Sequence, residues 1–153
     1  MNEKKVNIGL TGRTQKMTVV SELIRAEADG SISFGNYELE TKTKVSDFEH
    51  EGNLYKVKTF KDITKLERND MFVYESVPGT AVANFHTTEN GVSFVVAGAK
   101  DAQVTVELEA DTEYEIQLDG SVVDSQKTNL GGKLSMSIEL AEADCVNVSI
   151  LKK

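Results

Sequence analysis

The sequence contains no tryptophan, one proline, one cysteine and two histidines among its 153 residues. The single cysteine, Cys145, excludes an intramolecular disulfide, and we interpret it as a buried structural thiol in the strand-like run 145–150. Pro78 is the only proline, so extended runs are seldom interrupted. Only six Phe and four Tyr occur, which leaves little material for a broad aromatic binding surface.

Positive charge is also scarce. The 17 Lys and Arg face 25 Asp and Glu, which gives a net charge of −8 and a pI near 4.8. Proteins that bind nucleic acid need cations to displace the counterions of phosphates, and anionic membranes attract basic segments. The composition therefore argues against nucleic acid or a membrane as a partner and indicates a solvated, acidic surface.

Long apolar runs are missing as well, and no transmembrane helix is expected. Residues 1–16 are polar and lack the apolar centre of a signal peptide, so the cytoplasm is the default location. The alternation typical of strands begins at Met17. We therefore interpret residues 1–16 as an N-terminal extension or as an arm that docks on a neighbouring molecule.

Sequence patterns typical of β-strands are abundant, and they are clearest in the second half of the chain. Residues 103–109, 113–118 and 133–140 alternate apolar and polar side chains, as half-buried strands do. Asp119-Gly120 between two such runs predicts a type I′ hairpin turn, and Asn90-Gly91 predicts another turn. About six strands in some 60 residues are typical of a small β-sandwich.

The first half is β-rich but less regular. We expect strands at 18–26 and 31–40 around an Asp29-Gly30 turn, with a bulge at Gly35-Asn36. A second hairpin is expected from 41–48 and 54–60 around residues 50–53, and one helical turn at 62–66. Residues 20–28 are rich in helix formers, and a strand there is preferred over a helix.

These patterns predict an all-β protein in which an N-terminal β-hairpin meander precedes a small Ig-like antiparallel β-sandwich. The predicted division is an arm at 1–16, a meander domain at 17–88 and a sandwich module at 89–153. The boundary is placed near residues 87–91.

No catalytic constellation stands out. There is no Cys pair, HExxH motif or calcium loop, so no metal site and no cofactor are expected, although a surface Ca²⁺ site at the acidic turns 111–113 or 142–144 stays open. His50 and His86 are the only histidines that could act as bases, and they lie far apart in the sequence. The catalytic residues stay unknown. Paired carboxylates could serve a glycosidase, but with 25 acidic residues the sequence selects no pair.

Aromatic side chains gather in the first half, and those of β-modules that bind carbohydrate often stack on sugar rings. Core packing is the alternative interpretation of each. The ligand-binding candidates are Tyr37, Tyr55, Phe72 and Tyr74. The three arginines, Arg13, Arg25 and Arg68, are interpreted as solubilising surface residues, although a sialidase would use arginines to hold a sugar carboxylate.

Two resemblances add to this. Residues 114–120 and 128–135 look like the closing hairpins of Ig-like accessory modules attached to bacterial carbohydrate-active enzymes. Residues 20–25, 43–48, 54–60, 74–80 and 128–134 resemble short proteins of anaerobic Gram-positive bacteria, some of which are labelled endosialidase. That label implies cleavage of polysialic acid.

Three functions follow as hypotheses. The first is a non-catalytic binding or interaction module with a glycan or protein ligand. The second is a self-assembling structural protein, because open sheet edges and the N-terminal arm both offer routes to a homo-oligomer. The third is a sialidase-type glycoside hydrolase.

Overall fold

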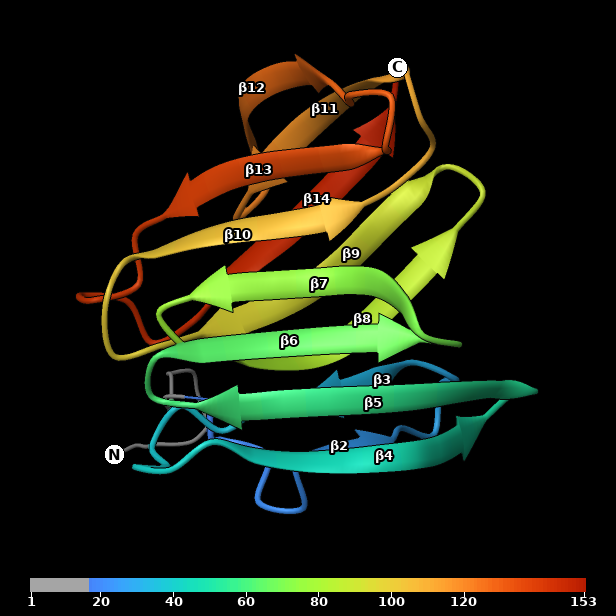
Figure 1. Cartoon of the computed structure of the whole chain (residues 1–153). Helices are drawn as coiled ribbons and strands as arrows, with labels where there is room; N and C mark the ends of the chain where they lie inside the picture. The colour runs from blue at the N-terminus through green and yellow to red at the C-terminus, as the bar shows by residue number, and fades with distance from the viewer. Residues whose placement is uncertain (1–16) are drawn as a thin grey trace.

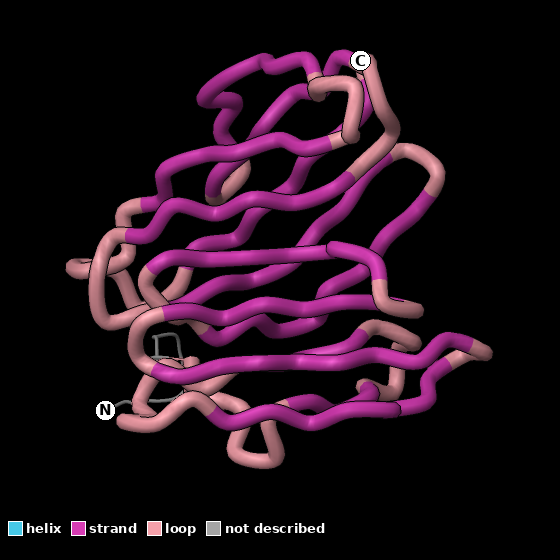
Figure 2. The backbone as a smooth tube through the Cα atoms, viewed as in Figure 1, coloured by secondary structure: helices cyan, strands magenta, loops and turns pink. Residues whose placement is uncertain are grey.

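The computed structural model describes residues 17–153 and folds them into two facing antiparallel sheets (Figure 1). Figure 2 shows that strands make up most of this part and that loops gather at the strand ends. The all-β sandwich expected from the alternation is confirmed. The described residues include no helix that is long and apolar enough to cross a membrane.

One sheet has six strands in the order β13-β10-β7-β6-β5-β4. Their bounds are Thr43–His50 (β4), Asn53–Phe60 (β5), Ile63–Arg68 (β6), Met71–Val77 (β7), Ala102–Glu107 (β10) and Lys133–Ile138 (β13). The other sheet has seven strands in the order β12-β11-β14-β9-β8-β3-β2. Their bounds are Ile24–Ala26 (β2), Ile32–Phe34 (β3), Ala81–Thr88 (β8), Gly91–Ala97 (β9), Glu113–Leu118 (β11), Ser121–Lys127 (β12) and Val146–Lys152 (β14).

The expected boundary near residues 87–91 falls inside the β8–β9 hairpin. Strands from both sides of it enter both sheets: β7 pairs with β10, and β8 pairs with β9. Side chains from both sides also belong to one buried apolar cluster. Residues 17–88 and 89–153 therefore share one sandwich, and the Ig-like assignment of the second range stays a prediction.

Aromatic packing joins the two sheets at the centre. Tyr74 of the six-stranded sheet meets Phe34, Phe85 and Phe94 of the seven-stranded sheet edge-on, with ring centroids 5.3, 6.2 and 5.7 Å away. Edge-to-face contacts of this kind add to the gain from burying the rings. Together with Tyr55 and Tyr114, these four make six of the ten aromatic residues that are buried in the core.

Hairpin turns follow the turn chemistry of the sequence. Glu51-Gly52, Asn69-Asp70 and Asp119-Gly120 all have positive φ at both central positions, as type I′ turns require. These turns set the registers β4–β5, β6–β7 and β11–β12. The turn expected at Asp119-Gly120 is confirmed.

Several expected elements of the first half are wrong. The predicted helical turn at 62–66 is strand β6, because Thr64 and Leu66 alternate into the core and pair with β5. The strands expected at 18–26 and 31–40 shrink to β2 and β3. Gly35 has φ 99° and ends β3 there, so no bulge continues the strand. The residues 1–16 expected to form an arm lie outside the described part.

Candidate functional site

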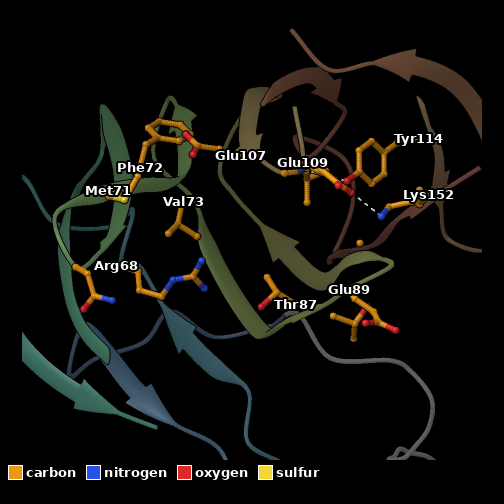
Figure 3. Close-up of a pocket in the computed structure, with 14 residues that line it drawn as sticks. Arg68, Met71, Phe72, Val73, Thr87, Glu89, Glu107, Glu109, Tyr114 and Lys152 are labelled. Carbon is orange, nitrogen blue, oxygen red and sulfur yellow. Dashed lines mark hydrogen bonds and ion pairs between the residues drawn. The ribbon is translucent and has the colours of Figure 1, made fainter. Parts of the chain in front are cut away.

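A polar cleft of about 740 Å³ opens at one end of the sandwich (Figure 3). It lies where the β6–β7 and β8–β9 turns approach the ends of β10 and β14 and the start of β11. We call it the end cleft. Its charged and aromatic lining comprises Arg68, Phe72, Glu89, Glu107, Glu109, Tyr114 and Lys152.

The cleft carries both signs of charge on facing walls. Arg68 reaches inward from the end of β6, and Glu89, Glu109 and Lys152 lie across the cleft from it (Figure 3). The Lys152 ammonium pairs with the Glu109 carboxylate, and this hydrogen bond raises the pKa of Lys152. Among the described residues, no ion pair involves Arg68. Its guanidinium therefore offers donors to a molecule in the cleft.

Cross-strand pairing holds the Phe72 side of the cleft. Glu107 of β10 is paired in register with Lys133 of β13, and the Lys133 ammonium lies 3.5 Å from the Glu107 carboxylate. The same ammonium lies 4.7 Å from the centre of the Phe72 ring, which is a cation–π contact. Phe72 is thereby fixed beside a carboxylate, with Met71 exposed next to it.

Tyr114 forms part of the cleft floor. Its ring is buried, and its hydroxyl accepts a hydrogen bond of 3.2 Å from the backbone N–H of Glu109. Because the hydroxyl fixes the backbone of Glu109, it also helps to place the Glu109–Lys152 pair. The buried Tyr114 side chain thus supports the wall formed by β10, β11 and β14.

A second, smaller cavity of about 130 Å³ adjoins the end cleft and brings the two histidines together. His50 at the end of β4 and His86 in β8 both line it, together with Asp29 and Glu51. The two cavities share Arg68, Val73 and Thr87 as lining residues. We call this cavity the histidine pocket.

Hydrogen bonds define the polar groups of the histidine pocket. The Nε2 atom of His50 lies 2.9 Å from the carbonyl oxygen of Gly30 and so donates to it, and it lies 3.9 Å from the Glu51 carboxylate. The pKa of Asp29 is lowered, chiefly by hydrogen bonds from Ser31 and further by the nearby His86. This convergence could not be predicted from the sequence, because the residues come from separate turns and strands that lie far apart along the chain.

The four aromatic candidates are not brought together. Phe72 lines the end cleft and Tyr55 lines the histidine pocket. Tyr74 has no exposed surface, and burial raises its pKa to about 12, so it serves the core. Tyr37 lies half-buried after β3 and lines neither the end cleft nor the histidine pocket, and burial raises its pKa as well.

The arginines and the cysteine considered in the sequence analysis lie in different surroundings. Arg25 pairs with Glu22 and Glu27, as a surface residue would, whereas Arg68 is half-buried and lines both cavities. Arg13 lies outside the described part. Cys145 is half-buried and directly precedes β14, so the buried strand thiol expected there is wrong. Within residues 17–153, no cluster of three or more His, Cys, Asp or Glu could hold a metal ion.

Comparisons with protein-family models, with curated proteins and with solved structures found no match. The class that the geometry defines is therefore a two-sheet β-sandwich with a charged cleft at one end. From the sequence, Arg68 is interpreted as a surface residue and no glutamate of that cleft is singled out, because charged residues near strand ends are common on any soluble β-protein.

Proposed function

We propose that this chain is a non-catalytic binding module that holds a glycan in the end cleft. The observation that carries the proposal is the lining of the cleft, in which Arg68 faces a wall of carboxylates beside an aromatic ring. Its volume of about 740 Å³ lies within the usual range of small-molecule sites.

The polar groups of the end cleft suit a ligand rich in hydroxyls. Each sugar hydroxyl donates one hydrogen bond and accepts others, so it needs donors and acceptors side by side. Arg68 and Lys152 supply donors, while the Glu89 and Glu109 carboxylates supply acceptors. A purely apolar ligand would cover the half-buried Arg68 guanidinium, which has no ion pair among the described residues, without giving it a partner, and this is costly.

The apolar groups of the end cleft lie at its edge. Met71 is 64% exposed and adjoins the Phe72 ring, which lines the cleft. The C–H face of a sugar packs well against such a surface, while its hydroxyls turn to the charged wall. This division of apolar edge and polar wall supports a glycan over a nucleotide, whose phosphates would be repelled by three glutamates.

A glycan panel of neutral and carboxylate-bearing saccharides, followed by calorimetric titration of the full chain, tests the proposal. Arg68→Ala should weaken binding of the best saccharide by about tenfold or more, because a charged hydrogen-bond donor is lost. Lys100→Ala is the matched control, because it removes an exposed cation outside the cleft. Thermal unfolding of both variants confirms that they fold. No binding to any saccharide at millimolar concentration would overturn the proposal.

A glycoside hydrolase is the competing function for the same cleft, because Glu89, Glu107 and Glu109 all line it and paired carboxylates carry out such hydrolysis. Incubating the full chain with each bound saccharide, polysialic acid included, and measuring new reducing ends separates the two. If product forms with the unmodified chain and disappears in Glu109→Gln, the chain is a hydrolase and the proposal of a non-catalytic module is wrong. Binding without product supports the module.

A further inference from the structure

A groove of about 600 Å³ lies between the two sheets on the side where β12 and β13 are the outermost strands. Its floor is apolar and includes Ile116 of β11 and Met136 and Ile138 of β13. Its acidic lining residues are Asp119, Asp124 and Glu139, and no Lys or Arg lines it. We call it the edge groove. It shares no lining residue with the end cleft.

Strand β13 borders this groove and has an outer edge to which a further strand could pair. It pairs only with β10, through six consecutive residue pairs without a shift in register. On its outer side, Asn129 satisfies the backbone of Lys133, and the Gln126 side chain donates to the Ser135 carbonyl. Alternate residues of a strand point their N–H and C=O groups the same way. Among the described residues, the outward N–H of Ser135 and both outward groups of Ser137 therefore lack backbone partners.

The other outer strands are poorer templates. β2 has three residues, and the register of β4 shifts between Val45 and Phe48, where Asp47 has φ 58°. β12 is shifted against β11 next to Val123. Short and bulged edges resist pairing, whereas a straight edge beside an apolar floor invites an added strand.

The chain itself contains a segment that fits. Val6-Asn7-Ile8-Gly9-Leu10 alternates apolar and small or polar residues, which is the pattern of a strand with one apolar face. Residues 1–16 hold four cations and one anion, so their net charge is +3, which leaves −11 for residues 17–153 of the total −8. A basic segment thus complements the acidic lining of the edge groove.

We infer that residues 6–10 of one copy add as a strand to the free edge of β13 in a second copy. Val6, Ile8 and Leu10 then cover the apolar floor, and Lys4, Lys5 and Arg13 meet the acidic lining. Backbone hydrogen bonds to Ser135 and Ser137 supply the register. The inference concerns a surface other than the end cleft and stands independently of the glycan proposal.

Chain length favours a second copy over the chain's own groove. The described chain begins beside β3, where Val20 bonds to Gly35, and β3 is five strand positions from β12. At about 4.8 Å per strand this is roughly 24 Å. The ten Cα steps from Leu10 to Val20 span at most about 36 Å when fully straight. Crossing to the facing sheet that contains β13 adds about 10 Å to the path, so only a nearly straight chain would reach its own groove.

Donor segment and acceptor groove are different surfaces of one chain. Mutual exchange between two copies closes a dimer, whereas one-way donation continues into rings or open chains. Either outcome raises the mass in solution, and both should weaken with added salt because opposite charges meet at the groove.

Sedimentation velocity of the full chain from about 5 to about 500 µM tests the inference, since mass action makes such assembly depend on concentration. Ile8→Asp should weaken association at least about tenfold, because it places a charge against the apolar floor. Asn7→Asp is the matched control, with the same added charge on the opposite face of the strand, and should change association less than about threefold. A synthetic peptide of residues 1–16 should dissociate the assembly by competition.

The groove side has its own matched pair. Val123 lines the edge groove and Val122 does not, and both are more than half exposed, at 55% and 58%. Val123→Asp should weaken association and Val122→Asp should not, while both variants stay folded. A monomer over the whole concentration range, or an assembly unaffected by Ile8→Asp and Val123→Asp, would overturn the inference.

Discussion

The Tyr74 hydroxyl lies 2.8 Å from the Thr80 hydroxyl, and both side chains are buried completely between the sheets. Thr80 also contacts the Ser76 hydroxyl at 2.7 Å, and its backbone N–H donates to the Thr64 hydroxyl. Thr64 in turn meets Thr59 at 2.8 Å. A chain of hydroxyls therefore runs through the six-stranded sheet to the segment where β8 begins.

Removing the hydroxyl of Thr80 should detach Tyr74 and Ser76 from this chain, because both bond to that hydroxyl. Thr80→Val keeps the shape but leaves the Tyr74 and Ser76 hydroxyls without their shared partner, and we expect a loss of about 2–4 kcal/mol in the free energy of unfolding. Urea titration measures it. Thr87→Val, at an exposed position of β8, is the control and should change stability by less than about 0.5 kcal/mol. Equal effects of the two variants would contradict a structural role for the hydroxyl chain.

The burial of Tyr74 should make the free energy of unfolding decrease at alkaline pH. Its folded pKa is raised, chiefly by burial, from the ordinary 10.0 to about 12, so the folded state favours the neutral phenol. The stabilisation is complete below pH 10 and is lost as the pH rises towards 12, by roughly 2–3 kcal/mol. Tyr74→Phe should remove this part of the pH dependence. Chemical denaturation of both proteins between pH 9 and about 12 measures the difference, and parallel curves would contradict the assignment.

Strict alternation made the second half predictable. The spacing predicts that six side chains of residues 104–118 face the core. Four of them are buried, and the other two, Leu108 and Leu118, are partly buried against it; the buried four are Val104, Val106, Tyr114 and Ile116. Alternation fixes the face of a strand but not its neighbour, so the pairing of β7 with β10 lay beyond the sequence. The same limit hid both cavities, because Arg68, His50 and His86 meet only once distant hairpins stack.

Threonine patterning explains the misread β6. Thr64 looks like a surface residue, yet it is buried because its hydroxyl bonds to the Thr80 carbonyl at 2.8 Å. A buried polar residue of this kind breaks the apolar alternation by which strands are recognised. The sequence pattern therefore predicts a helical turn where the central strand β6 lies.

Gly91 should tolerate no side chain. Its φ is 149°, and an added Cβ atom would lie 1.8 Å from the carbonyl oxygen of Ile150 in the neighbouring strand β14. Gly91→Ala should therefore cost about 3 kcal/mol or more in stability, because two paired backbones must separate. Gly52→Ala is the control: its φ is 82°, but nothing lies within 4 Å of the added atom, so the cost should stay near about 1 kcal/mol. Urea titration of both variants decides it, and equal costs would contradict the close approach.

The thiol of Cys145 should react slowly for an accessible cysteine. Burial raises its pKa above the ordinary value, and the nearby carboxylates of Asp119 and Asp144 raise it further. Since the thiolate is the reactive form, disulfide exchange with a chromogenic reagent at pH 8 should be at least about threefold slower than for glutathione. Asp144→Asn removes one of these charges and should speed the reaction, whereas Asp62→Asn, an exposed change in the β5–β6 turn, should not. A folded protein that reacts as fast as glutathione would show that neither burial nor charge governs this thiol.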